Sequence, residues 1–141
     1  MPCPVRVLLD SNVWLAILTT DGACRRMWRA TRRACVFVAS QEVLLEVQEK
    51  LGAEFGFSPR HARLMTSFVR RQTELVWAGS TVSICRDAED NAILAAAFDA
   101  GCSHLVTGDS DLLVLKQFET VAIVTPRQFG DWAAAIRPGE S

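Results

Sequence analysis

The chain has 141 residues, half of them hydrophobic and 22% charged, which is the composition of a folded domain and excludes a disordered protein. Its formal net charge of −1 excludes binding to nucleic acid or membranes through bulk charge alone. The five cysteines lie far apart, with no Cys-x-x-Cys pair or His/Cys cluster, which excludes a zinc ribbon, a thioredoxin-type motif and a disulfide framework.

Hydrophobic patterns along the chain alternate between strands and helices. Continuous apolar runs predict strands over residues 5–10, 35–40, 104–109 and 120–125. Helical spacing and end signals predict helices over residues 12–18, 22–33, 40–55, 58–76, 87–101 and 126–136, with a helical turn over 110–115. Ser40 is expected as an N-cap and Gly101 as a C-terminal cap. Apolar strands that alternate with helices indicate a parallel sheet covered on both faces.

The length of the chain and its hydrophobic runs set expectations for its domain organisation and location. We expect one domain over residues 1–141, with no linker or internal repeat. The start of the chain lacks a basic region followed by a long apolar stretch, and no apolar run approaches the roughly 18 residues of a membrane span. We therefore expect a cytoplasmic protein that has no membrane partner.

Acidic side chains directly follow two of the predicted strands. The run VRVLL leads into Asp10, and HLVTG leads into Asp109, with Asp111 two residues later. The carboxyl ends of parallel strands share one edge of a sheet, where ligand crevices lie, so Asp10 and Asp109 can converge there. Carboxylates that are brought together repel unless a cation compensates them, and a divalent ion with oxygen ligands does so.

Three further acids are weaker indications when each is taken singly. Asp87 and Asp90 open a predicted helix at the spacing of an N-cap and a first-turn acid, where the helix dipole favours carboxylates in any case. Glu46 borders the apolar stripe of its helix, where glutamate is usually solvated. Capping a short helix is the alternative role for the acids that follow the strands, Asp10, Asp109 and Asp111, but it does not explain why they fall at the same sheet edge.

Three separated motifs in one order resemble a PIN domain. They read LLDSNVWL, SQEVLLEV and DAEDNAILAAAFDAGCSHLVTGDSDLL, and the resemblance spans roughly residues 5–130. Within the family, the chain is most similar to the VapC-like toxin components of bacterial toxin–antitoxin systems. The resemblance implies an α/β fold, a three-layer α/β/α sandwich around a central parallel sheet. It also implies a metal-dependent ribonuclease, with Mg²⁺ or Mn²⁺ as cofactor, RNA as substrate, an antitoxin as possible partner, and a homodimer.

The resemblance also assigns roles to individual residues. The four acids that it makes catalytic and metal-binding are Asp10, Glu46, Asp90 and Asp109. The supporting positions, which include a possible accessory acid, are Asn12, Thr107 and Asp111. Either Asp87 or Asp90 can face the metal, so Asp87 is kept as a supporting residue. The implied reaction is hydrolysis of a phosphodiester, in which the metal activates water and stabilises the transition state.

An acidic crevice repels RNA, so we expect a separate basic surface to hold the substrate. Five arginines lie close together with no acid among them: Arg25, Arg26, Arg29, Arg32 and Arg33. Phosphate contact would make RNA binding sensitive to salt, whereas the alternative is a solvated basic face. Trp28 can stack on a base or pack inside. Single-stranded or looped RNA is favoured, because unpaired backbone can bend into a crevice.

Other classes of protein also place acids at strand ends. A phosphatase of the haloacid-dehalogenase type requires a second Asp two residues after the first, where Asn12 stands. A receiver requires an acid pair before its first helix and a late lysine, and Lys116 is misplaced for that role. A non-catalytic RNA- or protein-binding module on the same fold stays open, and metal binding would discriminate it from an enzyme.

Overall fold

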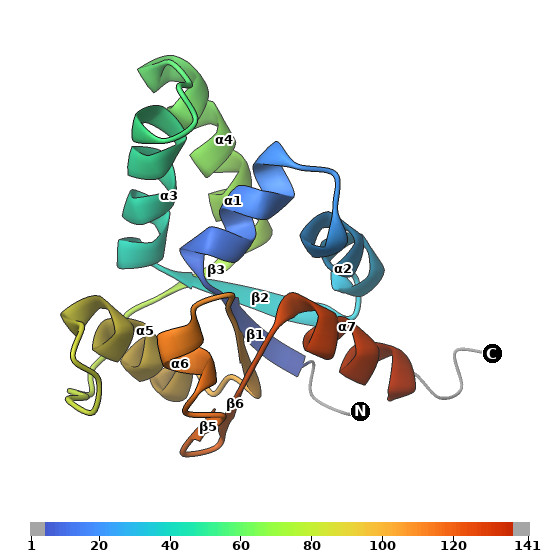
Figure 1. The fold of residues 1–141 in the computed structure, drawn as a ribbon, viewed down its shortest axis with the longest axis vertical. Helices are drawn as coiled ribbons and strands as arrows, with labels where there is room; N and C mark the ends of the chain where they lie inside the picture. Colours follow the sequence, from blue (N-terminus) through green and yellow to red (C-terminus); the bar gives the residue numbers. More distant parts are fainter. Residues whose placement is uncertain (1–4, 137–141) are drawn as a thin grey trace.

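The computed structural model describes residues 5–136 as one sheet with helices around it (Figure 1). The strands are β1 (Val5–Leu9), β2 (Cys35–Ser40), β3 (Glu74–Val76), β4 (His104–Val106), β5 (Gln117–Phe118) and β6 (Val121–Val124). The helices are α1 (Ser11–Thr19), α2 (Ala23–Thr31), α3 (Gln41–Ala53), α4 (Pro59–Gln72), α5 (Ala88–Asp99), α6 (Ser110–Leu113) and α7 (Pro126–Ala135). The ends of the predicted domain, residues 1–4 and 137–141, lie outside the described residues.

The strand order of the sheet is β3-β2-β1-β4-β6-β5. Neighbouring strands are parallel, except that β5 pairs antiparallel with β6. Val7, Leu8 and Leu9 of the central strand β1 have 0% exposure, which explains its continuous apolar run. From β1 the chain builds outward to β3 and then returns to place β4 on the other side of β1. The strand order therefore reverses between β1 and β4, and a crevice is expected at their carboxyl ends.

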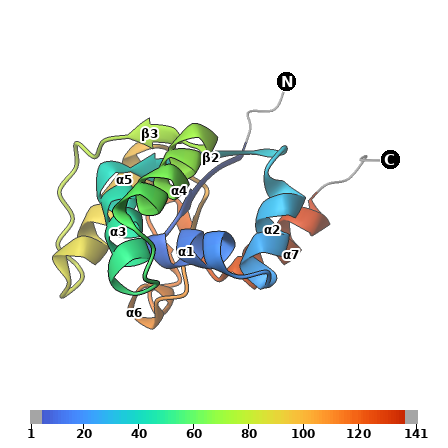
Figure 2. The same ribbon diagram turned by 90° about the horizontal axis from the view of Figure 1, so that it is seen from above.

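Helices flank the sheet on both sides, which confirms the predicted three-layer α/β/α sandwich. In Figure 1, α1 to α4 lie above β2, and α5 and α6 lie below it. Figure 2 shows α2 beside α7 at one end of the molecule, and α3, α4 and α5 toward the other end. Within residues 5–136, no helix is both long enough and apolar enough to cross a membrane.

Helix ends follow the predicted capping residues closely. Ser40 Oγ accepts the Val43 N–H at 3.2 Å and begins α3, as predicted. Gly101 has a φ of +69°, which suits a glycine just beyond the end of α5. The predicted helix over 58–76 is wrong in its last residues, because α4 ends at Gln72 and Glu74–Val76 pairs with the edge of β2. The antiparallel strand β5 was not predicted, since two residues are too few to show a period.

An aromatic cluster joins α1, α2 and β2. The ring centroids of Trp14 and Trp28 are 5.2 Å apart with the planes at 61°, and the Trp28 ring is 4.9 Å from that of Phe37. All three side chains are buried. Trp28 therefore packs inside, which resolves the choice between stacking on a base and packing. The aromatic cluster fixes α2 against α1, so the polar face of α2 points outward.

Candidate active site

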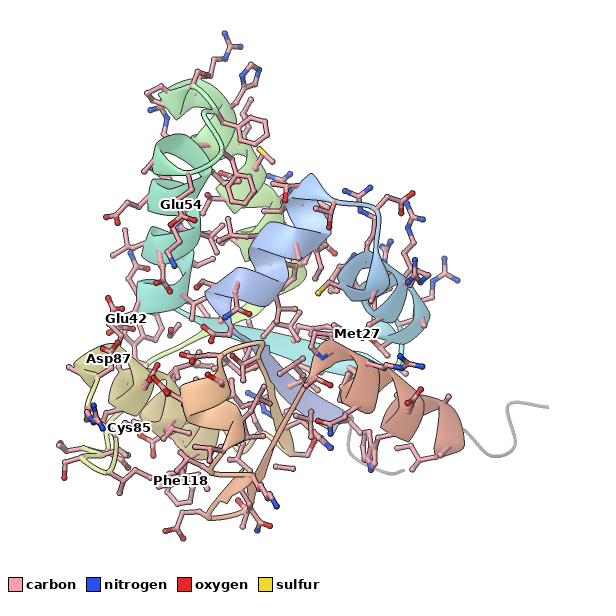
Figure 3. All side chains as sticks on the ribbon, viewed as in Figure 1. Met27, Glu42, Glu54, Cys85, Asp87 and Phe118 are labelled. Carbon is pink, nitrogen blue, oxygen red and sulfur yellow. The ribbon has the colours of Figure 1, made fainter. Side chains whose placement is uncertain are left out.

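A cleft of about 560 Å³ lies at the carboxyl ends of β1 and β4, between α3 and α5. It is lined by the four acids that the resemblance selects, and each comes from a different part of the chain. They are Asp10 after β1, Glu46 in α3, Asp90 in α5 and Asp109 after β4. Figure 3 labels Glu42 and Asp87, which lie near one another where α3 approaches the start of α5. Topology thus brings together acids that are far apart in the sequence.

Asp10 is the most enclosed acid of the cleft, with 9% of its surface exposed. Its Oδ1 accepts the Ser11 N–H at 2.7 Å, which caps α1. Its Oδ2 accepts from Thr107 Oγ1 at 2.8 Å and from Asn12 Nδ2 at 3.3 Å. Burial raises the pKa of Asp10 despite these hydrogen bonds, and the charges of Glu46 and Asp109 raise it further. A cation in the cleft would relieve that cost.

Asn12 and Thr107 join the ends of β1 and β4. Thr107 Oγ1 donates to Asp10 and accepts the Asp109 N–H at 3.0 Å. Asn12 Nδ2 donates to Asp10, while its Oδ1 accepts the Gly108 N–H at 3.1 Å. Both predicted supporting residues therefore lie in hydrogen-bond contact with the acidic strand ends, and they couple the position of Asp10 to that of Asp109.

Glu46 is fixed by two contacts that were not predicted. Ser11 Oγ donates to Glu46 Oε1, and Lys50 Nζ lies 3.3 Å from Glu46 Oε2. Lys50 follows Glu46 by four residues, so the sequence held a signal for that pair. No sequence spacing predicts the contact between Ser11 and Glu46, because the two residues lie on different helices. Ser11 thereby connects Glu46 to the residue next to Asp10.

Asp87 and Asp90 both line the cleft but differ in their contacts. Asp87 Oδ1 accepts the Glu89 N–H at 2.9 Å and caps α5. Asp90 stands in the first turn of that helix, and burial together with the charges of Asp109, Asp87, Asp10 and Asp111 raises its pKa to about 6. Capping alone does not separate the two, since Asp10 and Asp109 also cap helices. The charges of four other acids act on Asp90, which favours Asp90 over Asp87 as a ligand.

Side chains on α5 fix the segment that leads into it. The Asn91 carboxamide accepts the Cys85 N–H at 2.8 Å and donates to the Cys85 carbonyl at 3.0 Å. Near the other end of α5, Asp99 accepts the N–H groups of Gly79 and Ser80 at 2.6 and 2.7 Å. The approach to Asp87 is therefore held at both ends of the helix, by residues that no sequence pattern singled out.

Some predicted residues lie outside the cleft. Asp111 is exposed and is not among the residues that line it, although its N–H donates to Asp109 Oδ1 at 2.9 Å. None of the five clustered arginines lines it either, because α2 packs on α1 and α7. Arg25 Nε donates to the Ile17 carbonyl at 2.9 Å, and the other four arginines are exposed. The structure separates the acidic and the basic surface.

A second groove of about 540 Å³ lies between those two surfaces. Asn12 and Asp109 line both the groove and the acidic cleft, so the two are continuous at these residues. Cys24, in the first turn of α2, lines the groove from the other side. The groove therefore leads from the acids toward the helix that carries the arginines.

The cleft has the ligand chemistry of a hard cation. Its lining carries eight carboxylates, from Asp10, Glu42, Glu46, Glu49, Asp87, Glu89, Asp90 and Asp109. Oxygen donors of this kind suit Mg²⁺ or Mn²⁺. Across residues 5–136, no three His, Cys, Asp or Glu side chains form a ready-made metal-binding group. The acids surround the cleft without converging on one point, so the donor set fits a metal and its geometry is not preformed.

Comparison with known proteins gives the family. The family model of the PIN domain matches residues 6–111, which is most of the chain. The chain belongs to the PIN-domain family. This result confirms the resemblance that the three motifs predicted.

Solved structures agree with the PIN fold. PAE2754 from Pyrobaculum aerophilum has a TM-score of 0.65 and 20% identity, over 94% of this chain and 99% of that one. VapBC2 from Rickettsia felis, bound to a DNA fragment from their promoter, has a TM-score of 0.62 and 13% identity, over 84% of this PIN domain and 97% of that chain. At these identities the likeness is one of fold. No curated protein is significantly similar to this chain.

Proposed function

We propose that this PIN domain is a Mg²⁺- or Mn²⁺-dependent endoribonuclease and the toxin of a toxin–antitoxin pair. The observation that carries the proposal is the gathering of four carboxylates, from four separate elements, in one cleft at the switch point of the sheet. Membership of the PIN-domain family supports it, since these domains are generally nucleases.

In this proposal the residues that would hold the metal are Asp10, Glu46, Asp90 and Asp109. A bound divalent ion supplies an activated water and stabilises the charge of an in-line phosphodiester displacement. The chain's own hydrogen bonds orient the ligands, because Thr107 and Asn12 hold Asp10 and Ser11 holds Glu46. Oriented carboxylates reduce the reorganisation that metal binding requires.

Most contacts to the RNA backbone would lie outside the acidic cleft, where the phosphodiester is cut. The arginines of α2, together with Arg32 and Arg33 that directly follow it, are mostly exposed and have no acid among them. The groove beside Cys24 gives an unpaired strand a route from α2 to the cleft. We therefore assign the phosphate contacts outside the cleft to Arg25, Arg26, Arg29, Arg32 and Arg33.

We further propose a partner protein and a second copy of the chain. The Rickettsia felis structure is of VapBC2, and its fold similarity supports an antitoxin as the partner. The test is to express the chain together with any small gene that is found next to its own. Suppression of RNA cleavage and a stable complex are expected, and sedimentation of the free chain reports the homodimer.

The decisive experiment measures cleavage of a labelled single-stranded RNA with and without Mn²⁺. Wild type should cut only with metal, and Asp10→Asn should lose that activity while remaining folded, because Asn keeps an oxygen that can cap α1. Asp131→Asn is the matched control, since Asp131 is exposed on α7 and lies outside the cleft. RNA binding without cleavage by wild type would instead identify a non-catalytic binding module.

A further inference from the structure

One basic side chain faces the carboxylates of the cleft. Among its lining residues, all within the described part of the chain, Lys50 is alone in carrying a positive charge beside eight acids. The chain contains one other lysine, Lys116, which is exposed in the turn before β5. An anionic substrate that enters the cleft therefore has a single protein cation within it to meet.

The contacts of Lys50 leave it able to serve a second anion. Its Nζ lies 3.3 Å from Glu46 Oε2, and 33% of its side chain is exposed. A lysine side chain is protonated at neutral pH, so Lys50 brings a positive charge to the cleft. An ammonium has three donors, and the contact with Glu46 uses one.

The position of Glu46 keeps this amine at the cleft. Ser11 Oγ donates to the other carboxylate oxygen of Glu46, and this hydrogen bond restrains the carboxylate beside the cleft. The four-carbon stem of Lys50 is flexible, and its compact charge suits a phosphate oxygen. The arginines of α2 cannot take this role, because none of them lines the cleft.

We propose that Lys50 binds a phosphate of the RNA inside the cleft, beside the bond that is cut. This inference rests on the proposed ribonuclease function and adds a substrate contact to it. The amine shares its donors between Glu46 and the phosphate, which offsets the repulsion between the RNA and the surrounding carboxylates. The other role open to Lys50 is an ordinary ion pair along one helix, which would leave RNA binding unaffected.

The test compares Lys50→Gln with Lys116→Gln, which removes the same charge at a site away from the cleft. Binding of a fluorescein-labelled oligouridine is measured by anisotropy over a range of salt concentrations, with Ca²⁺ in place of Mg²⁺ to slow cleavage. Lys50→Gln should weaken binding at least roughly tenfold, as expected for one hydrogen bond to a charged group. Its log–log salt slope should fall by about 0.7, the value for one single-strand phosphate contact. Lys116→Gln should match wild type.

A second measurement uses the wild-type chain and does not depend on how a variant folds. Reductive methylation followed by peptide mass spectrometry reports the accessibility of each lysine. Excess oligouridine should protect Lys50 and leave Lys116 equally reactive.

Two results overturn the inference in distinguishable ways. If wild type binds the RNA while Lys50→Gln binds equally well and Lys50 stays reactive, the phosphate contact is wrong and the ribonuclease proposal stands. If wild type binds no RNA at any salt concentration, the proposed function and the contact are both wrong.

Discussion

Replacing Thr107 by valine would remove one hydroxyl from the joint between β1 and β4 and keep the shape of the side chain. Thr107 has 0% exposure. Its hydroxyl donates to Asp10 Oδ2 at 2.8 Å and accepts the Asp109 N–H at 3.0 Å. Both hydrogen bonds would be lost, and the buried Asp10 carboxylate would lose one of its three donors.

The expected cost follows from these two contacts. A hydrogen bond to a charged group contributes about 1.5–3 kcal/mol, and a neutral one contributes about 1 kcal/mol. We expect Thr107→Val to lower the free energy of unfolding by about 2.5–4 kcal/mol at neutral pH, and Tm by about 10 °C for a domain of this length. Thr107→Ser keeps the hydroxyl and is the matched control, with a smaller loss from the missing methyl group.

The same variant should change how stability depends on pH. Burial raises the pKa of Asp10 in the folded state, and the Thr107 hydrogen bond acts to lower it, so the variant should raise that pKa further. A carboxyl with a raised folded pKa loses stability as the pH rises through that value. The cost of Thr107→Val should therefore be larger at pH 7.5 than at pH 4.5, in urea titrations of the metal-free protein. An equal cost at both pH values, or one below about 0.5 kcal/mol, would refute the coupling of Thr107 to the Asp10 charge.

Three further outcomes are expected. Asp87→Ala should lower the free energy of unfolding by about 1 kcal/mol in urea titrations, because Asp87 caps α5; no loss would remove that role. Asp90→Asn should raise Tm by about 3 °C at pH 8 in EDTA, roughly 1 kcal/mol after allowance for solvent screening, because ionising this carboxyl is costly in the folded state. That gain should shrink as the pH falls from about 6 toward 3.8, and a gain independent of pH would contradict the cause. Replacing Arg26, Arg29 and Arg33 by Gln should weaken RNA binding and reduce its salt slope by up to about 0.7 per lost contact, with Mn²⁺ binding unchanged by calorimetry; an unaltered RNA affinity would mean that the face is merely solvated.

The features that could be predicted are those in which one physical signal extends over several residues. Central strands such as β1 are buried on both faces, so their apolar runs are continuous. The two strand-end acids followed from the same signal, because parallel strands must end at one edge. Edge strands escaped prediction, since β3 and β5 have three and two residues and depend on the neighbouring strand for their pairing.

Contacts that depend on tertiary packing could not be predicted. Ser11 meets Glu46 only because α1 and α3 pack together, and Asn91 meets Cys85 only because the incoming segment folds back along α5. The separation of the arginines from the acids has the same origin. Their helix is set by Trp28, whose partners Trp14 and Phe37 are distant in sequence. Composition along the chain shows that the arginines cluster, but it does not show where that cluster faces.

The packing of Trp14 against Trp28 also provides the molecule with an optical reporter. Two indoles whose centroids are 5.2 Å apart at 61° couple their strong electronic transitions and should produce a pair of opposite-signed bands in the far-ultraviolet circular dichroism spectrum. That signal requires α2 to be docked on α1. The signal can therefore show whether α2 is still docked in each arginine variant, even when the rest of the protein remains folded. Trp77 is 73% exposed and should therefore emit at longer wavelength than the buried pair. Its fluorescence can report on changes near Trp77 separately from changes in the core.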